Sequence, residues 1–270
     1  SVDDEALKVN VTFNSTKGEE IYINRINFLG NTKTRDKVIR REMRIADGDR
    51  FSGTKIANSK KRLKNTTYFK EIDMKMIKTD VPDKINLDVT VEERQTGTLS
   101  VGVGYSTADK MLVSGTISQE NFLGTGRKLF LEAGLSAITQ EYKFTYTDPY
   151  IFDKNLGSSF NIFNFSRIMD TYDYKKQGGG VSLMKPLTDD LKAAIGYRFE
   201  STKVTNIDDY ASIYVKDQAG TKVTSSVITS LTKNTIDDIM NPTKGIHSQI
   251  SFEVAGGPLS GDNYFCRSTA

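Results

Sequence analysis

The chain has 270 residues, 26% of them charged, and a formal net charge of +3 at pH 7. This charge and the pI of 8.7 argue against a nucleic-acid-binding protein, for which a pI above about 9 is expected. No apolar run approaches the roughly 18 residues of a transmembrane helix, which excludes a helical membrane protein but not a β-barrel, whose strands have only one apolar face.

Residues 1–18 contain one segment of alternating apolar residues, Leu7 to Phe13, which predicts a single strand. A lone strand is not stable by itself, so we expect this segment to be the tail of a preceding domain. The chain begins at Ser1 without a methionine or a signal region, which indicates a mature or shortened chain.

Residues 20–94 follow the order strand, helix, helix, strand, strand. The predicted strands are residues 20–30, 71–78 and 84–93, and the predicted helices are residues 34–45 and 52–65. Thr34 is the expected N-cap of the first helix. The unit contains 18 basic and 12 acidic residues, which indicates either a solvated basic helix face or a surface for an acidic partner.

From Leu99 onward, apolar and polar residues alternate with the two-residue period of strands. The pattern predicts nine strands, at residues 97–106, 110–121, 126–138, 139–149, 156–169, 174–185, 190–204, 219–236 and 245–256. Many of them reach the roughly 9–11 residues that a tilted strand needs to cross a bilayer. We therefore expect an outer-membrane barrel with its apolar face toward lipid, and a soluble β-sandwich is the alternative.

The connections between these strands are expected to differ at the two ends of the barrel. If the small unit lies at the periplasmic end, short turns are expected there and longer loops at the opposite end. The longest connection, around residues 205–218, then falls at the outer end. Tyr146, Tyr150 and Phe152 fall at the periplasmic end, where an interfacial girdle of aromatic residues is expected.

Several segments in a fixed order resemble one protein family. They are RREMR with Asp47–Gly48, SKKRLKNTTYF, VEERQTGTLSVGVGYS, NFLGTGRKL, TDPY and DDIMNPTKG. Together they resemble the last POTRA domain and the start of the barrel in the BamA family of outer-membrane protein assembly factors. The resemblance implies the tail of a preceding POTRA domain at residues 1–18 and an α+β POTRA domain at residues 20–94. It implies the N-terminal portion of an antiparallel transmembrane β-barrel at residues 96–270.

The same resemblance implies a location and a function. The barrel is expected in the bacterial outer membrane, with the POTRA domain in the periplasm. There the protein would fold and insert unfolded outer-membrane proteins into the lipid bilayer, together with outer-membrane lipoproteins of an assembly complex. A secretion or translocation pore of the same superfamily, or a passive outer-membrane channel, is the alternative.

The sequence departs from the family pattern at its C-terminal end. Only about nine strands are predicted, and the final CRSTA differs from the strand expected after GDNYF. An open sheet in hydrocarbon would leave its edge backbone groups unpaired, at a cost of several kcal/mol for each group. We therefore expect the chain to be a fragment or a truncated product.

The resemblance also implies two segments that pair with substrate strands. The first barrel strand forms a seam in the family, and its predicted pairing residues are Leu99, Ser100, Val101, Gly102, Val103 and Gly104. Glycines in this strand remove side-chain packing and so weaken its pairing, which would help the seam to open. The alternative is that they serve only ordinary packing on the lumen side. The second segment is an expected POTRA edge strand at Glu71, Ile72, Asp73, Met74, Lys75 and Met76, and its alternative is a solvated edge protected by lysines.

Arg40 and Asp47 match the charged positions through which the last POTRA domain of the family contacts a partner lipoprotein, and plain surface charge is the alternative. No enzymatic site, cofactor or metal is expected. The single histidine, His247, excludes His-based triads and multi-histidine metal sites. Gly124 to Gly126 resemble a phosphate loop but precede a strand, so a turn is expected there.

Overall fold

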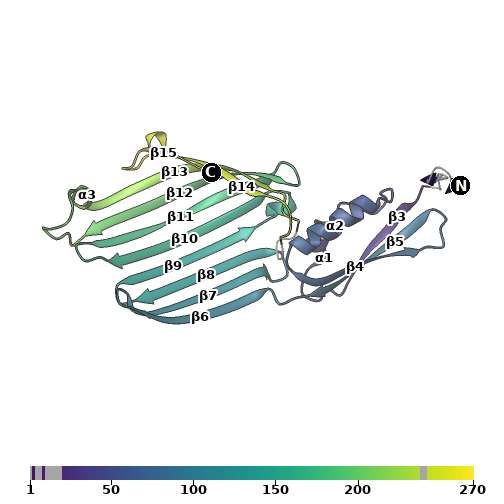
Figure 1. Ribbon diagram of the computed structural model, residues 1–270, viewed down its shortest axis with the longest axis horizontal. Helices are drawn as coiled ribbons and strands as arrows, with labels where there is room; N and C mark the ends of the chain where they lie inside the picture. Colours follow the sequence, from purple (N-terminus) through teal and green to yellow (C-terminus); the bar gives the residue numbers. More distant parts are fainter. Residues whose placement is uncertain (1, 4–7, 10–19, 238–241) are drawn as a thin grey trace.

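The computed structural model describes residues 2–3, 8–9, 20–237 and 242–270. They form a small α+β domain followed by one large antiparallel sheet (Figure 1). The predicted strand from Leu7 to Phe13 lies largely outside the described residues. Of residues 1–19, only β1 (Val2–Asp3) and β2 (Lys8–Val9) are described, and they pair with each other. None of the described helices is long and apolar enough to cross a membrane.

The small domain is a three-stranded sheet with two helices packed on one face (Figure 1). Its elements are β3 (Tyr22–Leu29), α1 (Asp36–Arg40), α2 (Gly53–Asn65), β4 (Phe69–Lys78) and β5 (Lys84–Glu93). β5 lies in the middle, parallel to β3 and antiparallel to β4. Alternate residues of the strands and the apolar stripes of both helices share one core, whose most buried side chains are Ile23, Val38, Ile39, Leu63, Leu87 and Val89.

The first helix is shorter than the sequence predicts, at both ends. Thr34 does not cap it, because the Thr34 hydroxyl accepts a hydrogen bond from Asn121 Nδ2 at 2.8 Å and Arg35 takes the N-cap position. In a continued helix the Arg44 N–H would donate to the carbonyl four residues earlier. It donates instead to Ser59 Oγ on α2 at 2.7 Å, so the helical ladder stops after Arg40.

The large sheet contains ten strands in sequence order, each antiparallel to its neighbours. They are β6 (Gly97–Ser106), β7 (Lys110–Phe122), β8 (Arg127–Ser136), β9 (Thr139–Asp148), β10 (Gly157–Ile168), β11 (Asp173–Pro186), β12 (Leu191–Thr205), β13 (Gly220–Asn234), β14 (His247–Ala255) and β15 (Phe265–Thr269). Nine of them follow the predicted segments closely. The tenth, β15, was not predicted, and it corrects the expected number of about nine strands.

β15 forms because β14 presents an edge to it, and the pairing runs from Ala255↔Phe265 to Ser251↔Thr269. Its own residues show little apolar alternation, so the sequence pattern does not predict it. The two ends of the sheet are therefore β6 and β15, which do not pair with each other in the described residues.

One face of the sheet is apolar and the other is polar. The register aligns one row across β6 to β10 on the apolar face, Leu99, Ile117, Leu131, Phe144 and Ile162. The adjacent row on the other face is Ser100, Thr116, Glu132 and Lys143. The described residues form no second layer over the apolar face, so the sandwich alternative is wrong.

The connections do not divide into short and long sets as expected. Four lie at the end next to the small domain: residues 123–126, 149–156 and 187–190, and the connection between β13 and β14, of which residues 235–237 and 242–246 are described. At the opposite end, residues 107–109 and 137–138 are shorter than any of these. The same end also has two longer loops. Residues 206–219 contain the short helix α3 (Ile213–Lys216). Residues 256–264 contain the 3-10 turn η2 (Gly257–Leu259) and form backbone hydrogen bonds with β13.

Candidate functional site

The first candidate site is the open edge of β6. This strand ends the ten-stranded sheet and pairs only with β7 in the described residues. Its apolar side chains are strongly exposed, from 69% at Val103 to 76% at Tyr105. An exposed edge strand with apolar side chains is a template for pairing with another strand.

The hydrogen-bond register shows which residues offer their backbone to this edge. Thr96 O accepts the Glu120 N–H at 2.9 Å, and the β6–β7 register continues without a shift from this pair. In an antiparallel pair, bonded and non-bonded residues alternate, so even-numbered residues of β6 exchange bonds with β7. The odd-numbered residues direct their N–H and C=O groups to the open edge, and they are Gly97, Leu99, Val101, Val103 and Tyr105.

The structure thus divides the predicted substrate-pairing residues of β6 into two sets. Leu99, Val101 and Val103 combine free backbone groups with apolar side chains. Ser100, Gly102 and Gly104 lie on the polar face and bond to β7. A Cβ at Gly102 would lie 2.8 Å from Ser114 Oγ, whereas nothing lies within 4 Å of one at Gly104. A side chain at Gly102 would therefore require the Ser114 hydroxyl to rotate away, whereas one at Gly104 would meet no obstacle.

The predicted second segment, Glu71 to Met76, lies on β4, which is an edge of the small sheet. Ile72 and Met74 pack onto the core, while Met76 is 57% exposed. Asp73 and Lys75 form an exposed ion pair at 3.2 Å, with both side chains on the face away from the helices. β3 is the opposite edge of the same sheet, so the small domain has two edges.

Arg40 and Asp47, the predicted partner-binding pair, form an ion pair with each other at 3.2 Å. The other carboxylate oxygen of Asp47 accepts the Ile26 N–H at 2.7 Å, and the Arg40 guanidinium lies 4.9 Å above the Phe28 ring. Both side chains remain about half exposed. Asp47 therefore fixes the chain after α1 to β3 while it presents charge to solvent.

The small domain is joined to the large sheet at the turn between β7 and β8. Asn121 is buried there, donates to Thr34 Oγ1 and accepts the Gly126 N–H at 2.7 Å. The Arg35 N–H donates to the Gly124 carbonyl at 3.0 Å, and the Tyr68 hydroxyl donates to the Gly126 carbonyl at 3.2 Å. Burial raises the pKa of Tyr68 to about 12, so this hydroxyl stays a donor.

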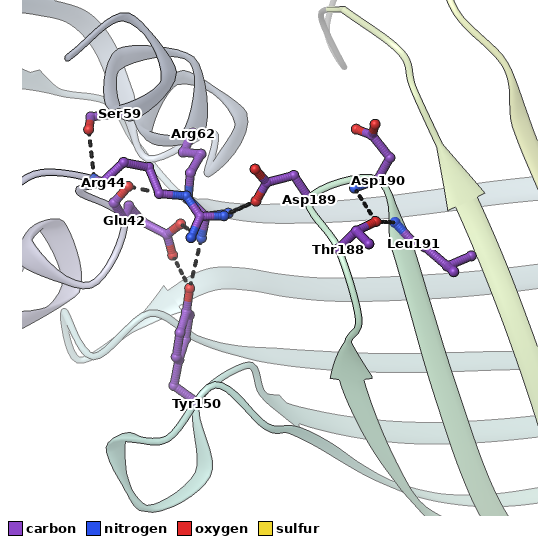
Figure 2. Close-up of polar contacts among 9 residues, drawn as sticks. All are labelled: Glu42, Arg44, Ser59, Arg62, Tyr150, Thr188, Asp189, Asp190 and Leu191. Carbon is purple, nitrogen blue, oxygen red and sulfur yellow. Dashed lines mark hydrogen bonds and ion pairs between the residues drawn. The ribbon is translucent and has the colours of Figure 1, made fainter. Parts of the chain in front are cut away.

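A second set of polar contacts ties the small domain to two further turns (Figure 2). Arg62 Nη2 pairs with Glu42 at 2.7 Å, and the Tyr150 hydroxyl donates to the same carboxylate at 2.9 Å. Arg44 pairs with Asp189 on the turn between β11 and β12, and Arg62 Nη1 lies 3.7 Å from Asp189. Burial, with the neighbouring Glu42 carboxylate, raises the pKa of Tyr150 to about 12.

These contacts correct one expectation from the sequence. Tyr150 points toward the small domain and does not form part of an outward aromatic girdle (Figure 2). Tyr146 lies opposite Phe160 on the apolar face, and Phe152 is 86% exposed at the same turn as Tyr150. The predicted girdle therefore keeps two of its three residues at most.

The residues of this junction were not identified as contacts from the sequence, because residues from separate turns meet only in the folded chain. They are Thr34, Glu42, Arg62, Asn121 and Asp189. The sequence offered one indication that three of these residues matter. Glu42, Arg62 and Asn121 belong to the segments RREMR, SKKRLKNTTYF and NFLGTGRKL, on which the family resemblance rests.

Glu93, at the end of β5, holds the loop that leads into α1. Its carboxylate accepts the Thr34 N–H at 2.6 Å, the Lys33 N–H at 2.9 Å and the Thr32 hydroxyl at 2.9 Å. Partial burial opposes its ionisation, but these hydrogen bonds outweigh that effect and hold the pKa of Glu93 below its usual value. These donors of the small domain therefore stabilise the ionised form of Glu93.

Of the residues considered for catalytic or phosphate-binding chemistry, His247 lies apart from these sites, whereas Gly124 and Gly126 belong to the β7–β8 turn of the junction. His247 begins β14, Cys266 is an exposed free thiol on β15, and Gly124 and Gly126 form the turn with positive φ angles of 68° and 73°. Across the described ranges, no group of three or more His, Cys, Asp or Glu residues is placed to hold a metal ion.

Comparisons with known proteins agree with this two-part architecture. A family model described as the Omp85 superfamily domain matches residues 121–270, and a POTRA model, described as a surface antigen variable number repeat, matches residues 21–94. The outer membrane protein assembly factor BamA of Nitratidesulfovibrio vulgaris is 35% identical over 259 residues, which cover 96% of this chain and 33% of the relative. BamA of Neorickettsia risticii is 31% identical over 264 residues, which cover 97% of this chain and 35% of the relative.

Solved structures share the fold. BamA from Haemophilus ducreyi lacking POTRA domains 1–3 superimposes with a TM-score of 0.65 at 24% identity, over 88% of this chain and 49% of that one. CdiB from Acinetobacter baumannii superimposes with a TM-score of 0.57 at 13% identity, over 92% of this chain and 47% of that one. The chain spans about a third of the length of the curated relatives. With more than half of its residues matched by the family model, the chain belongs to the Omp85 superfamily.

Proposed function

We propose that this chain is the part of an outer-membrane protein assembly factor that receives the strands of unfolded outer-membrane proteins. The observation that carries the proposal is the β6 edge, where apolar side chains and free backbone groups occur on the same residues. A strand can pair there through its backbone, so proteins of different sequence can be accepted. The role requires no catalytic residue, cofactor or metal.

The apolar face supports a location in the outer membrane. Its side chains remain exposed along the strands, as at Leu99, Ile162 and Phe252, and the described residues do not cover them. A lipid bilayer removes such a surface from water without a second protein layer. The POTRA domain, joined at the turn after β7, then lies on the periplasmic side.

Disulfide cross-linking in the full-length protein tests the proposed function. With Cys266 replaced by serine, a cysteine at Val101 is expected to form a disulfide with a cysteine in the terminal strand of a substrate, because directly paired Cβ atoms lie about 4.5–5.5 Å apart. Val181→Cys is the matched control, since Val181 is also an exposed valine on the apolar face but pairs with Phe160 and Tyr197 on its two sides. Equal cross-linking at both positions, or none at Val101, would contradict strand capture at β6.

We also propose that Arg40 and Asp47 contact an outer-membrane lipoprotein of the assembly complex. Asp47→Asn removes the charge and keeps an oxygen that can accept the Ile26 N–H, whereas Asp47→Lys would also remove this structural bond. We expect Asp47→Asn to lower the amount of co-purified lipoprotein about tenfold, with unchanged thermal unfolding of the POTRA domain.

Asp83→Asn is the control for this experiment, because it removes the same charge at the hairpin between β4 and β5. Asn tolerates the positive φ of 63° at that position. Co-purification that is equal for Asp47→Asn and the unaltered protein would remove the assignment.

We also propose that β4, an edge of the small sheet, is a second and weaker pairing edge for unfolded chains.

A further inference from the structure

A polar pocket of about 350 Å³ lies where the POTRA domain meets the start of β6. Its walls come from the loop before α1, the β5–β6 connection and the β7–β8 turn, and they include Lys33, Arg94, Gln95, Gln119 and Leu123. The junction residues Asn121 and Tyr68 also line it. The pocket is thus built from both parts of the chain.

Two cations line this pocket without a side-chain partner in the described part of the chain. The Lys33 and Arg94 side chains are exposed, and only their backbone groups make hydrogen bonds, to Glu93 and to the Tyr68 carbonyl. Glu93 also lines the pocket, but its oxygens are occupied by Thr32, Lys33 and Thr34. Lys33 and Arg94 exceed the single Glu93 carboxylate by one charge, so the pocket lining has a net positive charge, which favours an anionic ligand.

The row of free backbone groups on β6 leads into this pocket. Odd-numbered residues face the open edge from Tyr105 down to Gly97, and the next residue in the same phase, Gln95, is part of the pocket wall. A strand that adds antiparallel to β6 runs in the direction of β7, toward the POTRA domain. Its C-terminal end therefore arrives at the pocket.

We propose that Lys33 and Arg94 bind the C-terminal carboxylate of a strand paired with β6. A main-chain carboxylate is accepted by a guanidinium and an ammonium through charge-assisted hydrogen bonds. Leu123, which is 73% exposed on the same wall, offers an apolar surface to the terminal side chain. This site rests on the proposed function and adds to it a means to recognise a chain end and to set the register of the added strand.

Peptide binding to the full-length protein in a zwitterionic detergent tests the site. The probes are two synthetic peptides of about ten residues with alternating apolar residues. They share one sequence, and one ends in a free carboxylate while the other ends in an amide. We expect the acid to bind about tenfold more tightly than the amide, and the double variant Lys33→Gln/Arg94→Gln to abolish this difference while the amide binds as before.

Lys61→Gln is the control, because it removes an exposed positive charge from α2 that does not line the pocket. Equal binding of acid and amide to the unaltered protein would overturn the carboxylate site and leave strand capture intact. Failure of both peptides to bind would overturn the proposed function itself. Loss of the difference in phosphatidylglycerol nanodiscs, but not in phosphatidylcholine nanodiscs, would assign the pocket to an anionic lipid headgroup and overturn the proposal.

Discussion

Val101→Pro is expected to reduce strand capture by the full-length protein strongly, without unfolding it. The Val101 N–H faces the open edge, so proline removes no bond to β7, and an edge strand tolerates proline in this orientation. An incoming strand would lose one bond and keep an unpaired carbonyl, at a cost of about 1–3 kcal/mol, which corresponds to roughly a five- to 150-fold loss of pairing. The measurement is the amount of folded outer-membrane protein in cells depleted of the unaltered factor.

Two variants separate this effect from general damage. Val101→Ala keeps the N–H and is expected to support assembly. Ser100→Pro removes a bond to β7 and is expected to destabilise the sheet itself, which thermal unfolding would detect. Normal assembly by Val101→Pro would show that the β6 edge is not the pairing site.

Gly124→Ala is expected to separate the POTRA domain from the sheet. Gly124 has a φ of 68°, and a Cβ there would overlap the Lys33 carbonyl oxygen, which belongs to the backbone of the loop before α1. The backbone must shift, and the bond from the Arg35 N–H to the Gly124 carbonyl is lost. We expect a loss of about 3 kcal/mol from the junction and faster proteolysis of the β5–β6 connection at residues 94–96.

Gly115→Ala is the control for this prediction. Gly115 lies on β7 in extended backbone, and a Cβ there meets nothing within 4 Å. We expect its effect on the free energy of unfolding to be below about 0.5 kcal/mol, with unchanged proteolysis. Proteolysis of Gly124→Ala at the rate of the unaltered protein would show that the turn does not hold the junction.

The strands of the large sheet could be predicted from the sequence because successive residues alternate between two environments. The side chains of Leu99, Val101 and Val103 face one side, and this period of two persists whatever the strands later pair with. The division at residues 94–97 could also be placed from the sequence, since both predicted helices lie before it and only the alternation of strands follows it. Glycine marked two positive φ positions in NFLGTG, Gly124 and Gly126.

Other features depended on contacts that no local pattern encodes. β15 is a strand because β14 offers it an edge, and α1 ends at Arg40 because Ser59 accepts the Arg44 N–H. Tyr150 turns to the POTRA domain because its hydroxyl donates to Glu42, which lies 108 residues away in sequence. Periodicity describes one segment at a time, so it contains no information about such partners.

The sequence by itself determined which residues of β6 are apolar, and it placed them on one face. Only the tertiary structure decided that β6 is an edge, that its odd-numbered residues carry the free backbone groups, and that Lys33 and Arg94 line one pocket with its first residue. The physical reason is that side-chain alternation is a property of one strand, whereas hydrogen-bond direction and the gathering of charges depend on which neighbour is present and in which register.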